Sequence, residues 1–102
     1  MKIFLSFILL AICQLSYSGD FIGLDIRSSA ELEKNPAPGA IHLTVRDLDQ
    51  APRKLDKNMT IKVFCESGIR AERAKRKLEK MGFKNVENIS SWRDWNELQR
   101  KK

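Results

Sequence analysis

Residues 60–82, TIKVFCESGIRAERAKRKLEKMG, contain a strand, a short loop and a helix in direct succession. The segment Thr60–Phe64 is β-branched and aromatic, which is typical of a strand, and Cys65 follows at its carboxyl end. From Arg70 to Met81 the apolar residues recur at spacings of three and four, which predicts an amphipathic helix. Gly82 is placed to end this helix as its C-terminal cap. This order predicts one strand–helix unit of a parallel sheet.

Shorter elements alternate on either side of this unit. We expect strands at Phe21–Ile26, Ala40–Leu43 and Asn85–Ile89, and helices from Ser28 or Ser29 through Glu33, near Val45–Leu48 and from Ser90 or Ser91. Prolines and a glycine predict a turn at residues 35–39, and Pro52 predicts a break. The alternation predicts an α/β domain whose mostly parallel sheet is flanked by helices on both faces. Ligands of such sheets bind at the carboxyl ends of the strands, where Cys65 lies.

The first 18 residues have the pattern of a secretory signal peptide. A basic residue precedes an apolar run, Ile3–Ile12, and small residues stand at a cleavage site after Ser18. The run is too short for a membrane span, which needs about 20 apolar residues. We therefore expect a periplasmic or secreted domain of residues 19–102. The segment ending at Cys13 also loosely resembles a bacterial lipobox, in which Cys13 would be lipidated rather than removed.

The composition is that of one soluble globular domain: 102 residues, 42% hydrophobic and 31% charged. The formal net charge is +6, but basic and acidic residues are mixed along the expected helices. This pattern favours solvated helix faces over a nucleic-acid-binding surface, so we expect no nucleic-acid partner. The excess of positive charge still favours small anionic substrates. We also expect a monomer. Removal of Cys13 leaves Cys65 without an intramolecular disulfide partner. No metal or other cofactor is expected.

The loop Cys65-Glu66-Ser67-Gly68-Ile69-Arg70, called the cysteine loop below, joins the central strand to its helix. Such a turn directs backbone N–H groups into a concavity, and the helix adds its positive end. A thiolate is stabilised there, so we expect Cys65 to be nucleophilic. Gly68 permits the positive φ that a tight loop needs. Arg70 can direct its charge toward a bound anion or toward the loop's own carbonyls.

Four motifs, in this order along the chain, resemble those of single-domain rhodaneses, most closely the short periplasmic type known from the phage-shock operon. They are Leu24–Arg27, Pro38–His42, Ile61–Arg70 and Ala71–Glu87. The resemblance implies a small rhodanese-like fold and a sulfurtransferase. Cys65 would take sulfur from thiosulfate or a similar donor as a persulfide and pass it to a thiol or cyanide.

The resemblance also implies roles for neighbouring residues. The rest of the cysteine loop would bind substrate, and Asp25 and Arg27 would orient it as supporting residues. Two features depart from the family pattern: Ser90-Ser91 replaces a usual Gly-Gly pair, and the charge of Glu66 can disfavour a dianionic donor. These departures keep a second hypothesis open, an inactive rhodanese-like binding or regulatory module of the cell envelope.

Other functions fit the sequence less well. Related phosphatases and arsenate reductases carry one residue more between cysteine and arginine than the four present here. A thiol-redox cycle within the chain lacks a second cysteine once Cys13 is removed, which leaves only a sulfenic-acid sensor. We expect a structural role for His42, the only histidine, and core packing rather than a pocket wall for Trp92 and Trp95.

Overall fold

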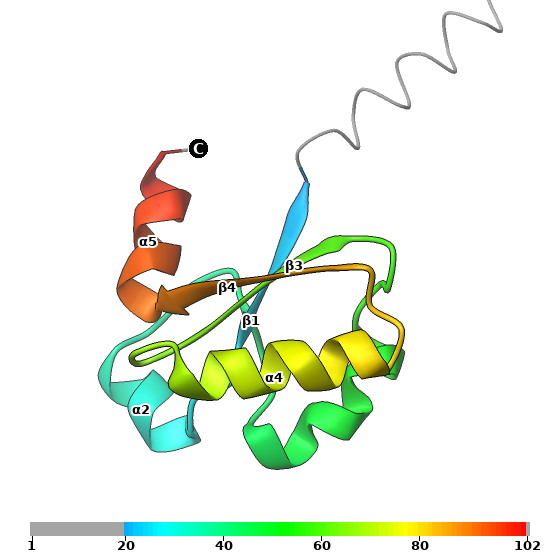
Figure 1. Ribbon diagram of the computed structural model, residues 1–102. Coiled ribbons are helices and arrows are strands. Elements are labelled where there is room, and N and C mark those ends of the chain that lie inside the picture. Colours follow the sequence, from blue (N-terminus) through cyan, green and yellow to red (C-terminus); the bar gives the residue numbers. More distant parts are fainter. Residues whose placement is uncertain (1–19, 102) are drawn as a thin grey trace, which may run out of the picture.

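The computed structural model describes residues 20–101 (Figure 1). The expected signal peptide, residues 1–18, and its Cys13 lie outside the described residues. Within 20–101, no helix is both long enough and apolar enough to cross a membrane.

The described chain folds as an α/β domain with a four-stranded sheet, in the order β2-β1-β3-β4 (Figure 1). The strands are β1 (Phe21–Asp25), β2 (Ile41–His42), β3 (Thr60–Cys65) and β4 (Asn85–Ser91). The helices are α2 (Ser29–Lys34), η1 (Val45–Gln50, a 3₁₀ helix), α3 (Ala51–Lys54), α4 (Ile69–Lys80) and α5 (Trp92–Arg100). Each pairing of neighbouring strands in this sheet is parallel. The expected α/β class and the parallel sheet are therefore confirmed.

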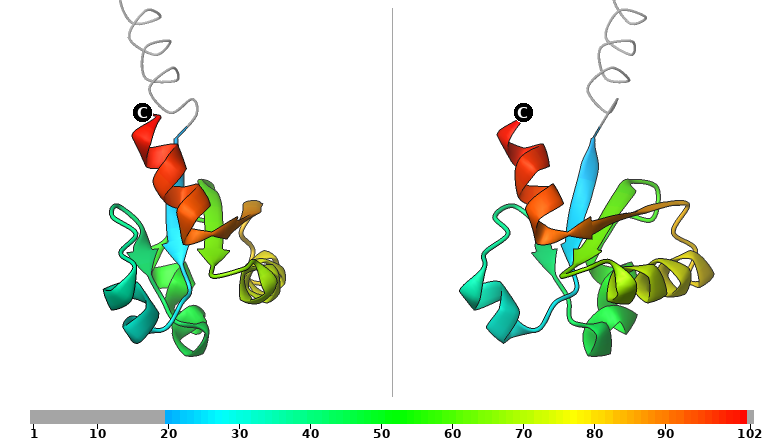
Figure 2. Two further views of the ribbon diagram at one scale, coloured as in Figure 1. Left: turned by 90° about the vertical axis from the view of Figure 1, so that its left-hand side faces the viewer. Right: turned by 60° about the vertical axis from the view of Figure 1, so that its left-hand side comes forward.

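Helices cover both faces of the sheet, as the sequence predicts. On one face, α4, η1 and α3 bury Ala71, Ala74, Leu78, Leu48 and Ala51 against Leu24, Ile61 and Val63. On the other face, a second cluster contains Ala37, Phe64 and Trp95, with residues of α2 and α5 packed around it. Figure 2 shows α4 and α2 on opposite sides of the strands.

Trp95 of α5 anchors the second cluster. Its indole stacks on Phe64 with ring centroids 5.6 Å apart and meets Phe21 edge-on at 5.8 Å. The same ring lies over Gly23, where a Cβ would stand only 2.3 Å from it. Core packing of Trp95 is therefore confirmed, and β1 needs glycine at the point where the ring crosses it.

Local capping signals place the helix ends. Ser28 caps α2 in a capping box with Glu31, and Ser91 caps α5 in another with Asp94. Gly82 follows α4 with φ +100°, as expected for a glycine at a helix C-terminus. The expected break at Pro52 is wrong. Pro52 lies in the first turn of α3, where its missing N–H would have no helical partner anyway.

Candidate functional site

Cys65 ends β3 at the carboxyl edge of the sheet and is almost fully buried, with 1% of its surface exposed. The N–H of Gly68 donates a hydrogen bond to its Sγ at 3.0 Å. Gly68 precedes α4 with φ +96°, so the positive φ expected from the sequence is confirmed. This conformation turns the cysteine loop back over the sulfur. The loop therefore directs a backbone donor, and the positive end of α4, at Cys65.

A β-bulge in β4 borders the cysteine loop. Val63 pairs with Asn88 but Cys65 pairs with Ser91, so β4 carries one extra residue between these pairs. Ser90 lies in this interval with φ +73°, a left-handed conformation that favours glycine. This is the position of the Gly-Gly pair expected from the family resemblance. Serine here costs about 1 kcal/mol of backbone strain.

Asn88 connects this bulge to the cysteine loop. Its Oδ1 accepts a hydrogen bond from the N–H of Ser90 at 2.9 Å. Its Nδ2 donates to the carbonyl of Gly68 at 3.0 Å. Asn88 therefore offsets part of the strain at Ser90 and fixes the position of Gly68. No local pattern in the sequence indicates this role, because the bulge that creates it forms only when β4 pairs with β3.

Arg70, the last residue of the cysteine loop, binds Glu31 of α2. Its Nη1 and Nη2 donate to the two carboxylate oxygens at 2.7 and 2.8 Å, a bidentate ion pair. The guanidinium lowers the pKa of Glu31 from 4.5 to about 2, outweighing the partial burial that would raise it. The carboxylate in turn raises the pKa of Arg70. The pair joins the loop to α2, a contact that sequence reasoning missed because the two residues lie 39 positions apart in the chain.

Replacing Glu31 with glutamine should remove an acid-dependent part of the stability. The folded pKa of about 2 lies below the ordinary value of 4.5. The pair therefore stabilises the fold above pH 4.5, and this contribution is lost as the pH falls toward 2. At neutral pH we expect a loss of about 1 kcal/mol, allowing for the partial exposure of the pair. Urea unfolding of both proteins from neutral pH downward measures the difference.

Glu33→Gln is the matched control, because Glu33 is an exposed carboxylate on the same helix. Its stability curve should follow that of the wild type at each pH. A Glu31→Gln curve that stays parallel to the wild-type curve throughout this range would contradict the assigned role of the pair.

Glu66, the second residue of the cysteine loop, is bound from α5. The Nε1–H of Trp92 donates to one carboxylate oxygen at 2.9 Å, and Nη2 of Arg93 donates to the other at 3.3 Å. The guanidinium of Arg93 also lies 4.5 Å from the centre of the Trp92 ring. The negative charge of Glu66 is therefore balanced by Arg93. Trp92, expected mainly in the core, also holds the loop.

Asp25 and Arg27 form a buried ion pair behind this region, with 1% and 0% of their surfaces exposed. Nη2 of Arg27 donates to Oδ2 of Asp25 at 2.8 Å and to the carbonyl of Asn35 at 2.7 Å. Its Nη1 donates to the carbonyl of Glu31, and its guanidinium lies 5.7 Å from the Trp92 ring centre. The pair therefore supports α2, which binds the end of the cysteine loop through Glu31, and it supports Trp92, which binds the beginning of the loop through Glu66.

Comparison with known proteins identifies the family. A profile of the rhodanese-like domain matches residues 14–98. The chain belongs to the rhodanese-like family. Thiosulfate sulfurtransferase PspE of Escherichia coli (strain K12) is 32% identical over 73 residues, which cover 70% of each protein. YrkF of Bacillus subtilis (strain 168), provisionally named a sulfur carrier protein, is 38% identical over 73 residues, 71% of this chain. The chain spans only 40% of the length of YrkF.

Solved rhodanese structures show the same fold. A structure titled as a rhodanese with anions from E. coli is 30% identical, with a TM-score of 0.66 over 74% of this chain and 91% of that one. The rhodanese-like domain of Alr3790 from Anabaena is 25% identical, with a TM-score of 0.69 over 78% of this chain and 93% of that one. These likenesses agree with the parallel sheet described above.

His42 has a structural contact within this rhodanese-like domain. Its Nε2 lies 2.6 Å from the carbonyl oxygen of Arg27, so this nitrogen carries the proton and donates. The contact fixes the backbone between the buried ion pair and α2. Within the described part of the chain, His, Cys, Asp and Glu side chains form no group of three that could hold a metal ion.

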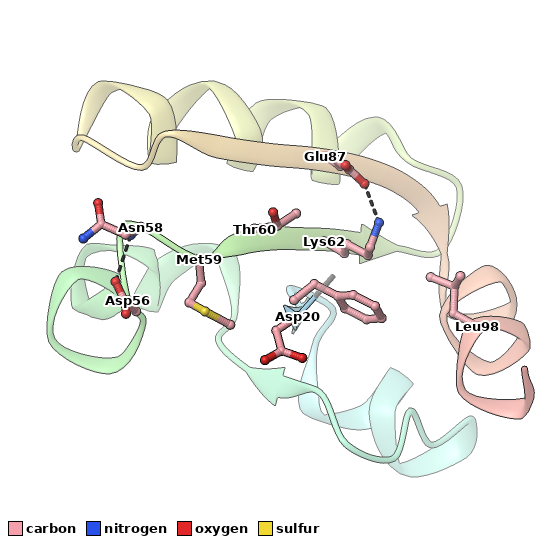
Figure 3. A pocket seen from close by; sticks show the side chains of 9 residues that line it. Asp20, Asp56, Asn58, Met59, Thr60, Lys62, Glu87 and Leu98 are labelled. Carbon is pink, nitrogen blue, oxygen red and sulfur yellow. Dashed lines mark hydrogen bonds and ion pairs between the residues drawn. The ribbon is translucent and has the colours of Figure 1, made fainter. Parts of the chain in front are cut away.

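Two hollows lie at opposite ends of the rhodanese-like sheet. One of about 460 Å³ adjoins the cysteine loop and is lined in part by Ser67 and Gly68. A larger one of about 750 Å³ lies at the amino ends of β1 and β3, beside the ion pair of Lys62 and Glu87 (Figure 3). Cys65 ends β3 at the other edge, so the larger hollow is remote from the sulfur. The candidate site is therefore the cysteine loop and its smaller neighbouring hollow.

Proposed function

We propose that this protein is a sulfurtransferase that moves a sulfane sulfur from thiosulfate or a similar donor to a thiophilic acceptor. Cys65 carries the sulfur as a persulfide. The observation that supports this most is the Gly68 N–H at 3.0 Å from Sγ, in a loop that opens a helix. A donor and a helix N-terminus at this place favour a negatively charged sulfur. The sulfurtransferase names of its relatives point to the same chemistry.

The reaction takes two displacement steps. The Cys65 thiolate attacks the outer sulfur of thiosulfate, the S–S bond of the donor breaks, and sulfite leaves with the electron pair. The enzyme then carries a persulfide anion on Sγ. A cyanide or thiolate acceptor attacks the terminal sulfur, the new S–S bond breaks, and its electron pair returns to Cys65. The second step restores the starting thiolate, so the cycle needs no external oxidant or reductant.

The side chains around the loop would hold it ready for these steps. Glu31 fixes the end of the loop at Arg70, and α5 fixes its beginning at Glu66. Because Arg93 balances the charge of Glu66, an anionic donor meets less repulsion than the sequence alone suggests. In this proposal Arg70 acts as a positioning residue through Glu31. Asp25 and Arg27 act as supporting residues through their contacts with α2 and Trp92.

Intact-mass measurement tests the proposal directly. The purified protein should gain the mass of one sulfur atom after incubation with thiosulfate, and lose it to cyanide as thiocyanate is released. A protein that gains no sulfur from thiosulfate, nor from glutathione persulfide, would reject the transferase. It would favour an inactive binding module, for which the strained Ser90 in place of glycine is the supporting observation.

We also propose that the protein acts outside the cytoplasm after cleavage behind Ser18. The same mass measurement on the exported protein identifies its first residue. Gly19 at the start agrees with a cleaved signal peptide, whereas a lipid on Cys13 would contradict it.

A further inference from the structure

The hollow of about 460 Å³ lies between α4 and the end of β4, against the outer side of the cysteine loop. Ser67 and Gly68 contribute one wall, and Ser90 contributes another. Gly68 belongs to both features, because its N–H also donates to Sγ of Cys65. Gly68 therefore lies between the hollow and the sulfur. Its size falls within the range of roughly 300–1,000 Å³ found for ligand sites, far more than one sulfur atom needs.

One side of this hollow is apolar and exposed. Ile69, the first residue of α4, has 67% of its surface exposed. Among residues 20–101, Val45 is the only other large hydrophobic residue that is exposed, with 47% of its surface accessible. Both follow strands that end at the carboxyl edge of the sheet, β3 and β2. Exposed apolar side chains at the rim of a reactive site are typical of surfaces that contact a partner.

The charge of the hollow is positive. Arg73 follows Ile69 by four residues and Arg76 follows by three more, so these side chains share one face of α4. Arg73 makes no ion pair with any of the described residues. Glu72 also lines the hollow, but its carboxylate accepts from Asn88 at 3.1 Å and faces Nε of Arg76 at 3.7 Å. The guanidinium of Arg73 is therefore left to bind an incoming carboxylate.

We propose that this hollow docks a protein acceptor of sulfur, through a segment with an acidic and an apolar residue beside its cysteine. The inference rests on the proposed function and names the acceptor class. The carboxylate binds Arg73, the apolar side chain contacts Ile69, and the acceptor thiolate reaches the terminal sulfur on Cys65. That thiolate attacks the sulfur, the persulfide S–S bond breaks, and its electron pair returns to Sγ. A small donor such as thiosulfate needs neither the apolar contact nor this volume.

Two synthetic peptides of equal length test the proposal, one with Glu-Cys-Leu at its centre and one with Gln-Cys-Leu. The sulfur-loaded wild-type protein should transfer sulfur to the acidic peptide about tenfold faster than to the neutral one. Arg73→Glu should abolish this preference, measured as the ratio of the peptide rate to the cyanide rate. Ile69→Ser should slow transfer to both peptides, because both carry the leucine.

Lys80→Glu is the matched control, since it makes the same charge change at the other end of α4. It should keep the preference for the acidic peptide. Equal rates for the two peptides with the wild type, or an equal loss of preference in Lys80→Glu, would overturn the docking site. Binding of the labelled peptides to Cys65→Ser, followed by fluorescence anisotropy, decides the docking independently of turnover. If Cys65 takes up no sulfur, the proposed function fails while this binding comparison still stands on its own.

Discussion

Replacing Cys65 with serine should give a folded protein that transfers no sulfur. In the proposed cycle this substitution removes the nucleophile that would carry the persulfide, so we expect the rate to fall by more than about a thousandfold. The fold should persist, because serine is of similar size and its Oγ can accept the Gly68 N–H that now binds Sγ. The stability loss should be about 1 kcal/mol, the usual result of placing a hydroxyl at a buried site with a partner. Thiocyanate release and thermal unfolding by circular dichroism measure the two effects.

Cys13→Ser is the matched control when both variants are made in the uncleaved full-length chain, because it removes the other cysteine of the sequence. It should load and release sulfur like the wild type. Sulfur transfer near the wild-type rate in Cys65→Ser, with loss of transfer in Cys13→Ser, would assign the carrier to the wrong cysteine. Transfer near the wild-type rate in both variants would reject a cysteine persulfide altogether.

Replacing Asp25 with alanine should cause the largest loss of stability among the substitutions considered. Arg27 would keep its charge at a site with 0% of its surface exposed, without the carboxylate that now balances it. Breaking a buried pair in this way costs about 3–5 kcal/mol, a large share of the roughly 5–15 kcal/mol that stabilises a typical domain. Urea unfolding, together with the yield of soluble protein, measures the loss.

Glu87→Ala is the surface counterpart, since Glu87 pairs with Lys62 at 2.5 Å on the exposed side of β4. Its loss should stay below about 1 kcal/mol. Asp25→Asn keeps an oxygen that can accept hydrogen bonds from Arg27, so its loss of stability should fall between those of Asp25→Ala and Glu87→Ala. This variant keeps the prediction testable if Asp25→Ala does not fold. Equal losses of stability in Asp25→Ala and Glu87→Ala would show that the buried Asp25–Arg27 pair stabilises the fold no more than the exposed Lys62–Glu87 pair does.

Much of the fold was predictable because its signals are local. The strand before Cys65 and the helix after it follow from side-chain alternation and periodicity within single segments. Ser28, Ser91 and Gly82 mark helix ends, since a cap depends on residues a few positions away. The same holds for Gly68, whose positive φ the tight loop requires. The misjudged Pro52 shows the limit, because proline both breaks a helix and begins one.

The partners of the site were not predictable, because they are distant in sequence. Glu31 lies 39 residues from Arg70, and Glu66 lies 26 residues from Trp92. Each pair meets only after α2 and α5 pack beside the carboxyl ends of the strands, next to the cysteine loop. Neither local propensity nor a motif encodes such a meeting, because any exposed acid could pair with any nearby base. The geometry of the docked helices selects which one does.

Local patterns are enough to predict that a cysteine lies between a buried strand and a helix, and hence that its sulfur lies at the carboxyl edge of a parallel sheet. How that sulfur is surrounded depends on tertiary packing. Pairing of β4 with β3 created the bulge at Ser90, and helix packing bound Arg70 to Glu31. These features differ in their range along the chain. Capping and periodicity act over a few residues, whereas ion pairs and bulges depend on which elements the folded core brings together.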